Sequence, residues 1–300
     1  MKIIPSIEIG EAELIASNVP EDDAPEWEAG TEYTLGDRVI LAAGHSVYQS
    51  NVADNLGNDP SAVDSTAWLR VGATKAWRAF DDVVSDPISQ LGTISYTIKP
   101  ASLVRGVGLV RVSAALATVR VLTPSGQELV SQTKYLADYS EMIDALAMVS
   151  IPPRQEDMTV FEDVICQPGN HLEITIGDGT GTAEVSEIVI GDTLEIGTSL
   201  FGVDLGIDDW SIADRDDFGN LSVVERDYND RASIPVAVKT NDIPRIRRKL
   251  AALRAKLALY YVSASGNDFG ATIYGKYASF RILISGPNTS DAEIEIEGVI

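Results

Sequence analysis

Short runs of alternating apolar and polar residues fill the middle of the chain. In such a run, successive side chains lie on opposite faces of a strand, so one face is buried and the other is solvated. The runs are Thr93–Ile98, Val107–Val112, Ala117–Leu122, Met158–Phe161, His171–Ile176 and Ala183–Ile190. Strands of this length and spacing predict an antiparallel β-sandwich, with a jelly-roll-like sandwich as the first choice. The apolar stretch Met142–Met148 predicts a helical turn between two of the strands.

The last hundred residues combine strand-like runs with one helical pattern. The strand-like runs are Ser233–Val238, Ala271–Tyr274, Ser279–Ile284 and Ala292–Ile300. Asn241 and Asp242 precede Pro244, which is typical of the start of a helix. Apolar residues then repeat every three or four positions, at Ile246, Leu250, Leu253 and Leu257. This spacing predicts an α+β domain with one amphipathic helix packed on a sheet.

The other face of the predicted helix is basic and carries six of the 23 basic residues of the chain. They are Arg245, Arg247, Arg248, Lys249, Arg254 and Lys256. One interpretation is a solvated face that offsets the acidic charge of the chain. The other is a subunit interface, in which this face meets an acidic stretch of a neighbouring copy, such as Asp204–Asp217. For that interface the candidate residues are Arg245, Arg247, Arg248 and Lys249.

The front of the chain has a pattern of its own. Lys2–Ile15 predicts one or two strands, and Asn18–Pro25 is an acidic linker containing proline. Arg38–Leu41 and Ser46–Ser50 then predict the two strands of a hairpin. The aromatic and glycine positions of this segment are, in order, Trp27, Gly30-Thr31-x-Tyr33, Gly36-Asp37-x-Val39, Val47-Tyr48, Gly57-x-x-Pro60, Trp68 and Gly72.

This order of positions resembles the small carbohydrate-binding modules of families 5 and 12 that are attached to chitinases and cellulases. The resemblance covers about a sixth of the chain. It implies that Trp27, Tyr33, Tyr48 and Trp68 include the rings that stack on sugar faces. Similar modules usually carry another aromatic residue where this chain has Asn51–Leu56, so the sugar contact is open while the module fold is expected. The alternative is that the four rings form the core of a segment too short to bury much else.

The arrangement of the whole chain resembles structural proteins of tailed bacteriophages, namely tail or baseplate proteins. The features that carry this resemblance are the N-terminal arm, the Trp27–Gly72 insert, the restart at Trp77–Phe80, Asp217-Phe-Gly-Asn220 with Val224-x-Arg226, Tyr274-Gly-x-Tyr277 after the helix, and the closing Glu295-Ile-Glu-Gly298. The resemblance implies a non-enzymatic protein of the virion tail, made in the host cytoplasm without a signal peptide. Its implied partners are other tail or baseplate proteins, copies of itself in a ring or trimer, and a host-surface glycan.

We therefore expect four segments. They are an N-terminal β arm and linker at 1–25, the module-like insert at 26–73, the β-sandwich at 74–200 and an α+β assembly domain at 201–300. Two other functions stay open. One is a secreted bacterial protein that binds or degrades polysaccharide with an accessory module. The other is a purely structural tail adaptor whose insert does not bind sugar.

Charge and composition narrow the range of partners. The net charge of −22 and the pI near 4.3 disfavour binding to nucleic acid or to an anionic membrane. Cys166 is the single cysteine, so no disulfide forms within the chain. The first residues contain no apolar run long enough for a secretion signal, and no stretch approaches the length of a membrane span.

Catalytic chemistry has little support in the sequence. The two histidines, His45 and His171, are too few for a convincing metal cluster, and no Gly-x-Ser-x-Gly motif occurs. The segment from Asp214 to Glu225 has some of the spacing of a calcium loop, but Phe218 stands at a ligand position. A solvated acidic turn is the alternative to calcium binding there. We expect no enzymatic activity, no cofactor and no bound metal.

Overall fold

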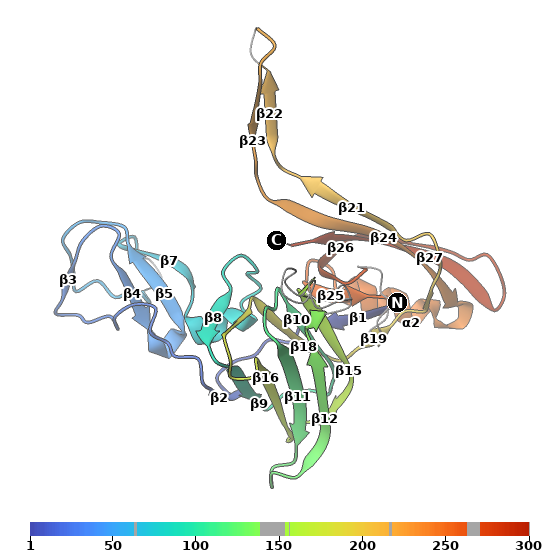
Figure 1. The fold of residues 1–300 in the computed structure, drawn as a ribbon, viewed down its shortest axis with the longest axis horizontal. Coiled ribbons are helices and arrows are strands. Elements are labelled where there is room, and N and C mark those ends of the chain that lie inside the picture. The colour runs from blue at the N-terminus through green and yellow to red at the C-terminus, as the bar shows by residue number, and fades with distance from the viewer. Residues whose placement is uncertain (63–64, 139–153, 156, 216–217, 263–270, 300) are drawn as a thin grey trace, which may run out of the picture.

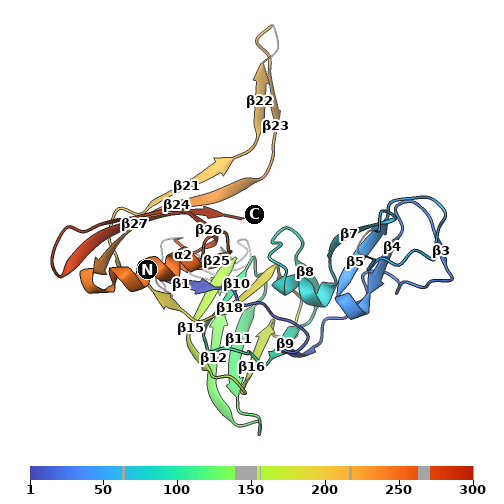
Figure 2. The same ribbon diagram turned by 180° about the vertical axis from the view of Figure 1, so that it is seen from behind.

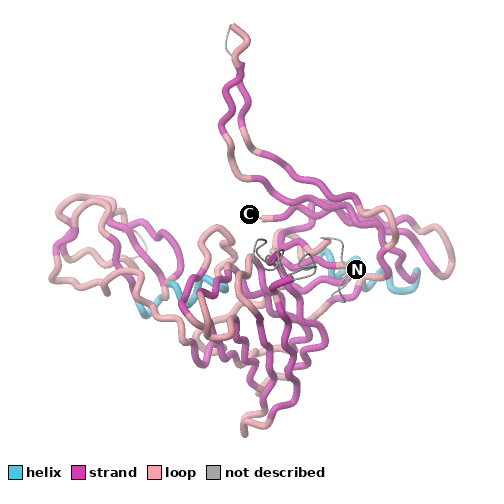
Figure 3. Tube along the Cα trace, in the orientation of Figure 1, coloured by secondary structure: helices cyan, strands magenta, loops and turns pink. Residues whose placement is uncertain are grey.

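The computed structural model describes the chain except for residues 63–64, 139–153, 156, 216–217, 263–270 and 300. The described residues are mainly β, with several antiparallel sheets and one α-helix near the C-terminus (Figures 1 and 3). This confirms the expected fold class. The helical turn predicted over Met142–Met148 lies outside the described residues.

Two antiparallel sheets form the sandwich in the middle of the chain. The five-stranded sheet has the order β12-β11-β16-β9-β2, and the three-stranded sheet has the order β15-β10-β18. Their strands are β2 (Leu14–Ser17), β9 (Ile94–Ile98), β10 (Val104–Val110), β11 (Leu116–Leu122), β12 (Glu128–Tyr135), β15 (Met158–Cys166), β16 (His171–Ile176) and β18 (Glu187–Gly191). Tyr96 and Val119 of the first sheet share one core with Phe161 and Ile190 of the second. The chain crosses repeatedly from one sheet to the other, as expected of a jelly-roll-like sandwich.

The predicted strand Ala183–Ile190 is two strands that belong to different sheets. β17 (Thr182–Val185) pairs with β8 (Ile88–Leu91), whereas β18 pairs with β10. Ser186 lies between them and is buried. A further short pair joins β13 (Ala137–Asp138) to β14 (Arg154–Gln155).

The C-terminal domain is one large antiparallel sheet covered by a helix. The strand order is β19-β1-β25-β26-β27-β24-β20, and β21 also pairs with β24. The elements are β1 (Lys2–Pro5), β19 (Leu194–Glu195), β20 (Thr198–Ser199), β21 (Asp204–Asp209), β24 (Tyr228–Lys239), η3 (Thr240–Asp242), α2 (Ile243–Ala252), β25 (Ala258–Tyr261), β26 (Ile273–Leu283) and β27 (Thr289–Gly298). Ile246 and Leu250 of α2 pack against Ile234, Val236 and Ile294 of the sheet. The predicted helix and its apolar face are therefore present.

The sandwich and the C-terminal sheet pack closely because glycines line the contact. A Cβ atom on Gly191 would lie 2.0 Å from the backbone oxygen of Pro5, and one on Gly108 would lie 2.2 Å from Leu259 Cδ2. Met1, just before β1, donates a hydrogen bond from its amine to Gly197 O at 2.6 Å. The N-terminal segment is thus divided, because β1 joins the C-terminal sheet and β2 joins the sandwich. β19 and β20 also pair in the C-terminal sheet.

The module-like segment leaves the sandwich after β2 and returns before β9. It contains the sheet β4-β5-β7 and the pair β3-β6. The elements are β3 (Glu32–Tyr33), β4 (Arg38–Leu41), η1 (Ala42–Gly44), β5 (Ser46–Ser50), β6 (Asn55–Leu56), β7 (Trp68–Ala73) and η2 (Lys75–Phe80). β4 and β5 form the predicted hairpin with the predicted bounds. Figure 2 shows the module to one side of the sandwich.

A two-stranded arm projects from the edge of the C-terminal sheet. β21 pairs with the first residues of β24, and the chain beyond them forms β22 (Ile212–Arg215) and β23 (Leu221–Val224), which pair with each other. Figures 1 and 2 show this ribbon extending away from the rest of the molecule. The acidic stretch that begins at Asp204 therefore forms one side of an extended hairpin.

Candidate functional site

Two of the four candidate sugar-binding rings form the core of the module. Tyr33 and Trp68 are buried and meet edge to face, with ring centroids 5.2 Å apart. The Tyr33 hydroxyl accepts a hydrogen bond from the Glu28 N–H at 2.8 Å, and the Trp68 indole donates to Asn58 O at 2.8 Å. Their ring surfaces and polar groups are thus used inside the module. Tyr33 and Trp68 therefore have the core role that was the alternative to stacking on a sugar.

Trp27 and Tyr48 are half-buried and pack against that core from outside. The indole N–H of Trp27 is buried without a hydrogen-bond partner in the described part of the chain. Apolar side chains elsewhere on the module are more exposed, notably Leu35 and Leu69. The sugar contact stays a prediction, and among the four rings it now rests on Trp27 and Tyr48.

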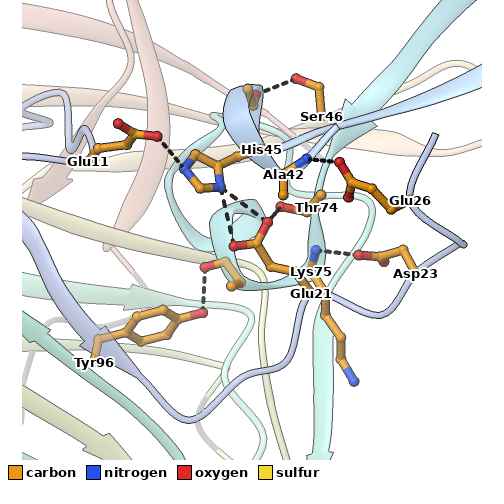
Figure 4. A network of polar contacts seen from close by, with 12 residues as sticks. Glu11, Glu21, Asp23, Glu26, Ala42, His45, Ser46, Thr74, Lys75 and Tyr96 are labelled. Carbon is orange, nitrogen blue, oxygen red and sulfur yellow. Dashed lines mark hydrogen bonds and ion pairs between the residues drawn. The ribbon is translucent and has the colours of Figure 1, made fainter. Parts of the chain in front are cut away.

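A polar junction ties the module to the linker before it and to η2 after it (Figure 4). The His45 ring lies between two carboxylates, with Nδ1 3.1 Å from Glu21 Oε2 and Nε2 3.2 Å from Glu11 Oε1. The same ring stacks on Trp77, with centroids 4.2 Å apart. Glu21 also accepts a hydrogen bond from the Thr74 hydroxyl at 2.5 Å. These contacts hold the His45 turn of the module against both segments that connect it to the sandwich.

A second pair of contacts strengthens the junction on the side of η2. Asp23 accepts a hydrogen bond from the Lys75 N–H at 2.7 Å and forms an ion pair with Arg78. The acidic linker, which was expected only to connect two segments, thus contributes Glu21 and Asp23 to the contact with η2 and the residue before it. The sequence gives no local signal for it, because His45 and its carboxylate partners are distant along the chain.

A buried carboxyl group, that of Glu187, lies where the sandwich, the segment after η2 and the C-terminal sheet meet. Glu187 is 1% exposed, and its Oε2 accepts the Asp82 N–H at 3.2 Å while its Oε1 has no hydrogen-bond partner among the described residues. Tyr274 donates to the Asp82 carboxylate at 2.7 Å. Burial, together with the charges of Asp82 and Asp81, raises the pKa of Glu187 to about 9. The Glu187 carboxyl is therefore neutral at pH 7.

The remaining features to place are the Cys166 thiol, groups of metal-ligating side chains and apolar helices. Burial raises the pKa of the Cys166 thiol to about 11, so the nucleophilic thiolate is not populated at neutral pH. Within the described ranges, no group of three His, Cys, Asp or Glu side chains is placed to hold a metal ion. The predicted calcium loop includes Asp216, which lies outside the described residues. No helix in the described part of the chain is long and apolar enough to cross a membrane.

The arm exposes apolar side chains on both of its faces. Paired residues share a face, so Ile212 and Val224 lie on one side of the distal hairpin and Ala213 and Val223 on the other. The large exposed apolar residues of the arm are Leu205, Ile207, Trp210, Ile212, Phe218, Leu221, Val223, Val224 and Tyr228. Phe218 is 91% exposed and Trp210 is 55% exposed.

The apolar face that α2 covers continues onto the arm without a cover. Ala232 and Ile234 of β24 are buried under α2, and side chains two residues apart on a strand share a face. Leu205 pairs with Ala232 and Ile207 pairs with Asp230, so both lie on that same face. Both side chains are exposed in the described part of the chain.

The basic candidate residues are exposed on the outer side of α2. Arg245 lies 3.8 Å from Asp242, and Arg248 Nε donates to Pro244 O at 3.2 Å. Arg247 and Lys249 have no ion-pair partner in the part of the chain that is described. The helix therefore presents basic side chains that the fold of one chain does not neutralise.

No family model, curated protein or solved structure matches this chain. The arrangement of its own residues therefore carries the functional argument.

Replacing Glu187 by Gln should flatten the dependence of stability on pH. Between its ordinary pKa of 4.5 and the raised value of about 9, Glu187 is protonated in the folded protein and ionised in the unfolded chain. The unfolded chain then binds fewer protons, so the free energy of unfolding falls as pH rises, by about 1.4 kcal/mol per pH unit. Urea unfolding at pH 6, 7 and 8 should show this extra slope in the wild type and not in E187Q.

The matched control is Glu8→Gln, because Glu8 is exposed. This variant should keep the wild-type slope. Equal slopes for wild type and E187Q would contradict the assignment of a neutral buried carboxyl.

Proposed function

We propose that the chain is a non-enzymatic structural protein that assembles with copies of itself, of the kind found in the tail tip or baseplate of a tailed bacteriophage. The observation that carries this proposal is the arm. A two-stranded ribbon is marginally stable in water by itself, and exposed apolar patches mark interaction sites. The arm exposes large apolar side chains on both faces, so we expect a partner to cover it.

The positions of the arm and the module support a role in assembly and display. The arm and the module project from different sides of the body (Figures 1 and 2). Copies held together through the arm would then present one module each. A weak sugar contact repeated in this way gains avidity without a tight single site. We include attachment to a host-surface glycan in the proposal on this basis.

A purely structural adaptor is the second candidate function. The burial of Tyr33 and Trp68 favours it, because two of the four candidate rings have no free face for a sugar. In that case the module is a packing element or a spacer.

Removing the distal arm should convert the assembled protein to single copies. Asp209 pairs with Tyr228, so residues 210–227 can be replaced by a two-residue Asn-Gly turn that keeps this register. We expect the wild type to form oligomers in mass photometry and the shortened variant to remain a single chain with an unchanged melting temperature. The control is L129S/Y135S, which removes two exposed apolar side chains from β12 and should still assemble.

A wild type that stays a single chain at all accessible concentrations would contradict the proposed function. So would a shortened variant that assembles as the wild type does.

Glycan binding by the full chain should depend on the half-buried rings of the module. We expect the wild type to bind chitin- or cellulose-type oligosaccharides on a glycan array, and Y48S and W27A to bind more weakly. Loss of one stacking ring costs about 1 kcal/mol, or roughly fivefold in Kd per site. Y135A is the control, because Tyr135 is 78% exposed on the sandwich, away from the module.

Circular dichroism must show the same fold for all variants. A wild type without glycan binding would exclude the attachment role and leave the adaptor.

A further inference from the structure

A hollow on the arm combines an aromatic ring with carboxylates. Trp210, Glu225, Arg226 and Asp227 line it, at the base of the distal hairpin. The Trp210 N–H donates to Asp227 O at 3.3 Å, and the Arg226 N–H donates to the Ser211 hydroxyl at 3.0 Å. These bonds hold the two strands together where the hollow lies. An exposed tryptophan face beside two carboxylates suits a guanidinium group, which stacks on aromatic rings and pairs with carboxylates.

The arm as a whole is acidic. From Asp204 to Arg231 the sequence contains nine acidic and three basic residues, which gives a net charge of −6. Among the described residues, Asp214, Glu225 and Asp227 of the arm form no ion pair. The apolar side chains of the arm are therefore interspersed with negative charge.

Helix α2 and the turn after it have the opposite character. From Ile243 to Leu257 the sequence contains six basic residues and no acidic residue, which gives a net charge of +6. Arg and Lys side chains can lie with their methylene groups along an apolar surface while their charged ends reach carboxylates. A surface of this kind matches both the apolar and the acidic groups of the arm.

The distal hairpin and α2 of one chain lie apart. Strand β24 runs from the base of the arm at Tyr228 to Lys239, just before α2. Helix α2 then runs back along the sheet, where Leu250 O accepts a hydrogen bond from the Tyr277 hydroxyl at 2.9 Å. Figures 1 and 2 show the distal arm extending away from α2. The two surfaces can therefore neutralise each other when they belong to different copies.

We propose that the arm of one copy docks on the basic face of α2 in the next copy, with an α2 arginine in the hollow beside Trp210. This inference deepens the proposed function, on which it rests, by naming the two surfaces that join. Arg247 and Arg248 are the arginines nearest the centre of the basic face. The contact joins two different surfaces, so it is head-to-tail. Such a contact closes into a ring or continues as an open filament.

Reversing charges on one surface should prevent assembly, and combining the two reversals should restore it. The helix variant is R247E/R248E/K249E, and the arm variant is D214R/E225R/D227R. Each should raise the Kd of assembly at least about 100-fold. In an equimolar mixture, the acidic helix of one variant faces the basic arm of the other, and the unchanged surfaces also match. Mass photometry should therefore show single chains for each variant and oligomers for the mixture.

The control variant is R38E/K99E/R281E, which changes the net charge by the same amount on other exposed surfaces. It should assemble like the wild type. Circular dichroism and melting temperature should show that all three variants are folded. A helix variant that assembles normally would overturn the inference, and so would a mixture of folded variants that stays as single chains.

The test separates this inference from the proposed function. If the wild type assembles and the shortened arm abolishes assembly while the charge reversals do not, the proposed function stands and the docking surface is another one. If the wild type never assembles, both are wrong.

Discussion

The arm is a two-stranded ribbon whose apolar side chains are exposed on both faces. In the C-terminal sheet, α2 covers the apolar face of β24 through Ile246 and Leu250. The same face continues onto the arm at Leu205 and Ile207, which are exposed in the described part of the chain. A two-stranded ribbon has unpaired edges as well, and natural proteins rarely leave such edges and apolar faces free. Docking against another copy would cover the unpaired edges and bury the apolar faces.

The rest of the molecule holds the arm on a sheet that packs closely against the sandwich. β24 continues from the arm into the sheet, and that sheet packs on the sandwich through contacts close enough to require Gly108 and Gly191. The module is fixed separately, by the His45 junction with Glu11 and Glu21. Because the distal hairpin extends away from α2, attraction between its acidic groups and the basic helix favours contact between chains (Figure 1). The overall charge of −22 also opposes less specific association.

The elements with local patterns were predictable from the sequence. Alternation predicted β9, β10, β11, β15 and β16 of the sandwich but not β12, and the spacing of Ile246 and Leu250 predicted α2 with its basic outer side. The arm was not predicted as a hairpin, because apolar and polar residues do not alternate regularly over Ile212–Arg215 and Leu221–Val224. The predicted strands Ala271–Tyr274 and Ser279–Ile284 belong to one strand, β26, in which an irregularity between Tyr277 and Ser279 interrupts the alternation. Pairing between strands that are distant in the chain, such as β1 with β25, produces no pattern in the sequence of either strand.

Amide hydrogen exchange on the arm tests the central claim most directly. The backbone amides of β23 should exchange at least tenfold more slowly when the protein is concentrated enough to assemble than when it is diluted to single chains, because burial protects them. Amides of β16, inside the sandwich, should exchange equally slowly in both states. Rapid exchange of β23 at every concentration would contradict the claim that another copy covers the arm.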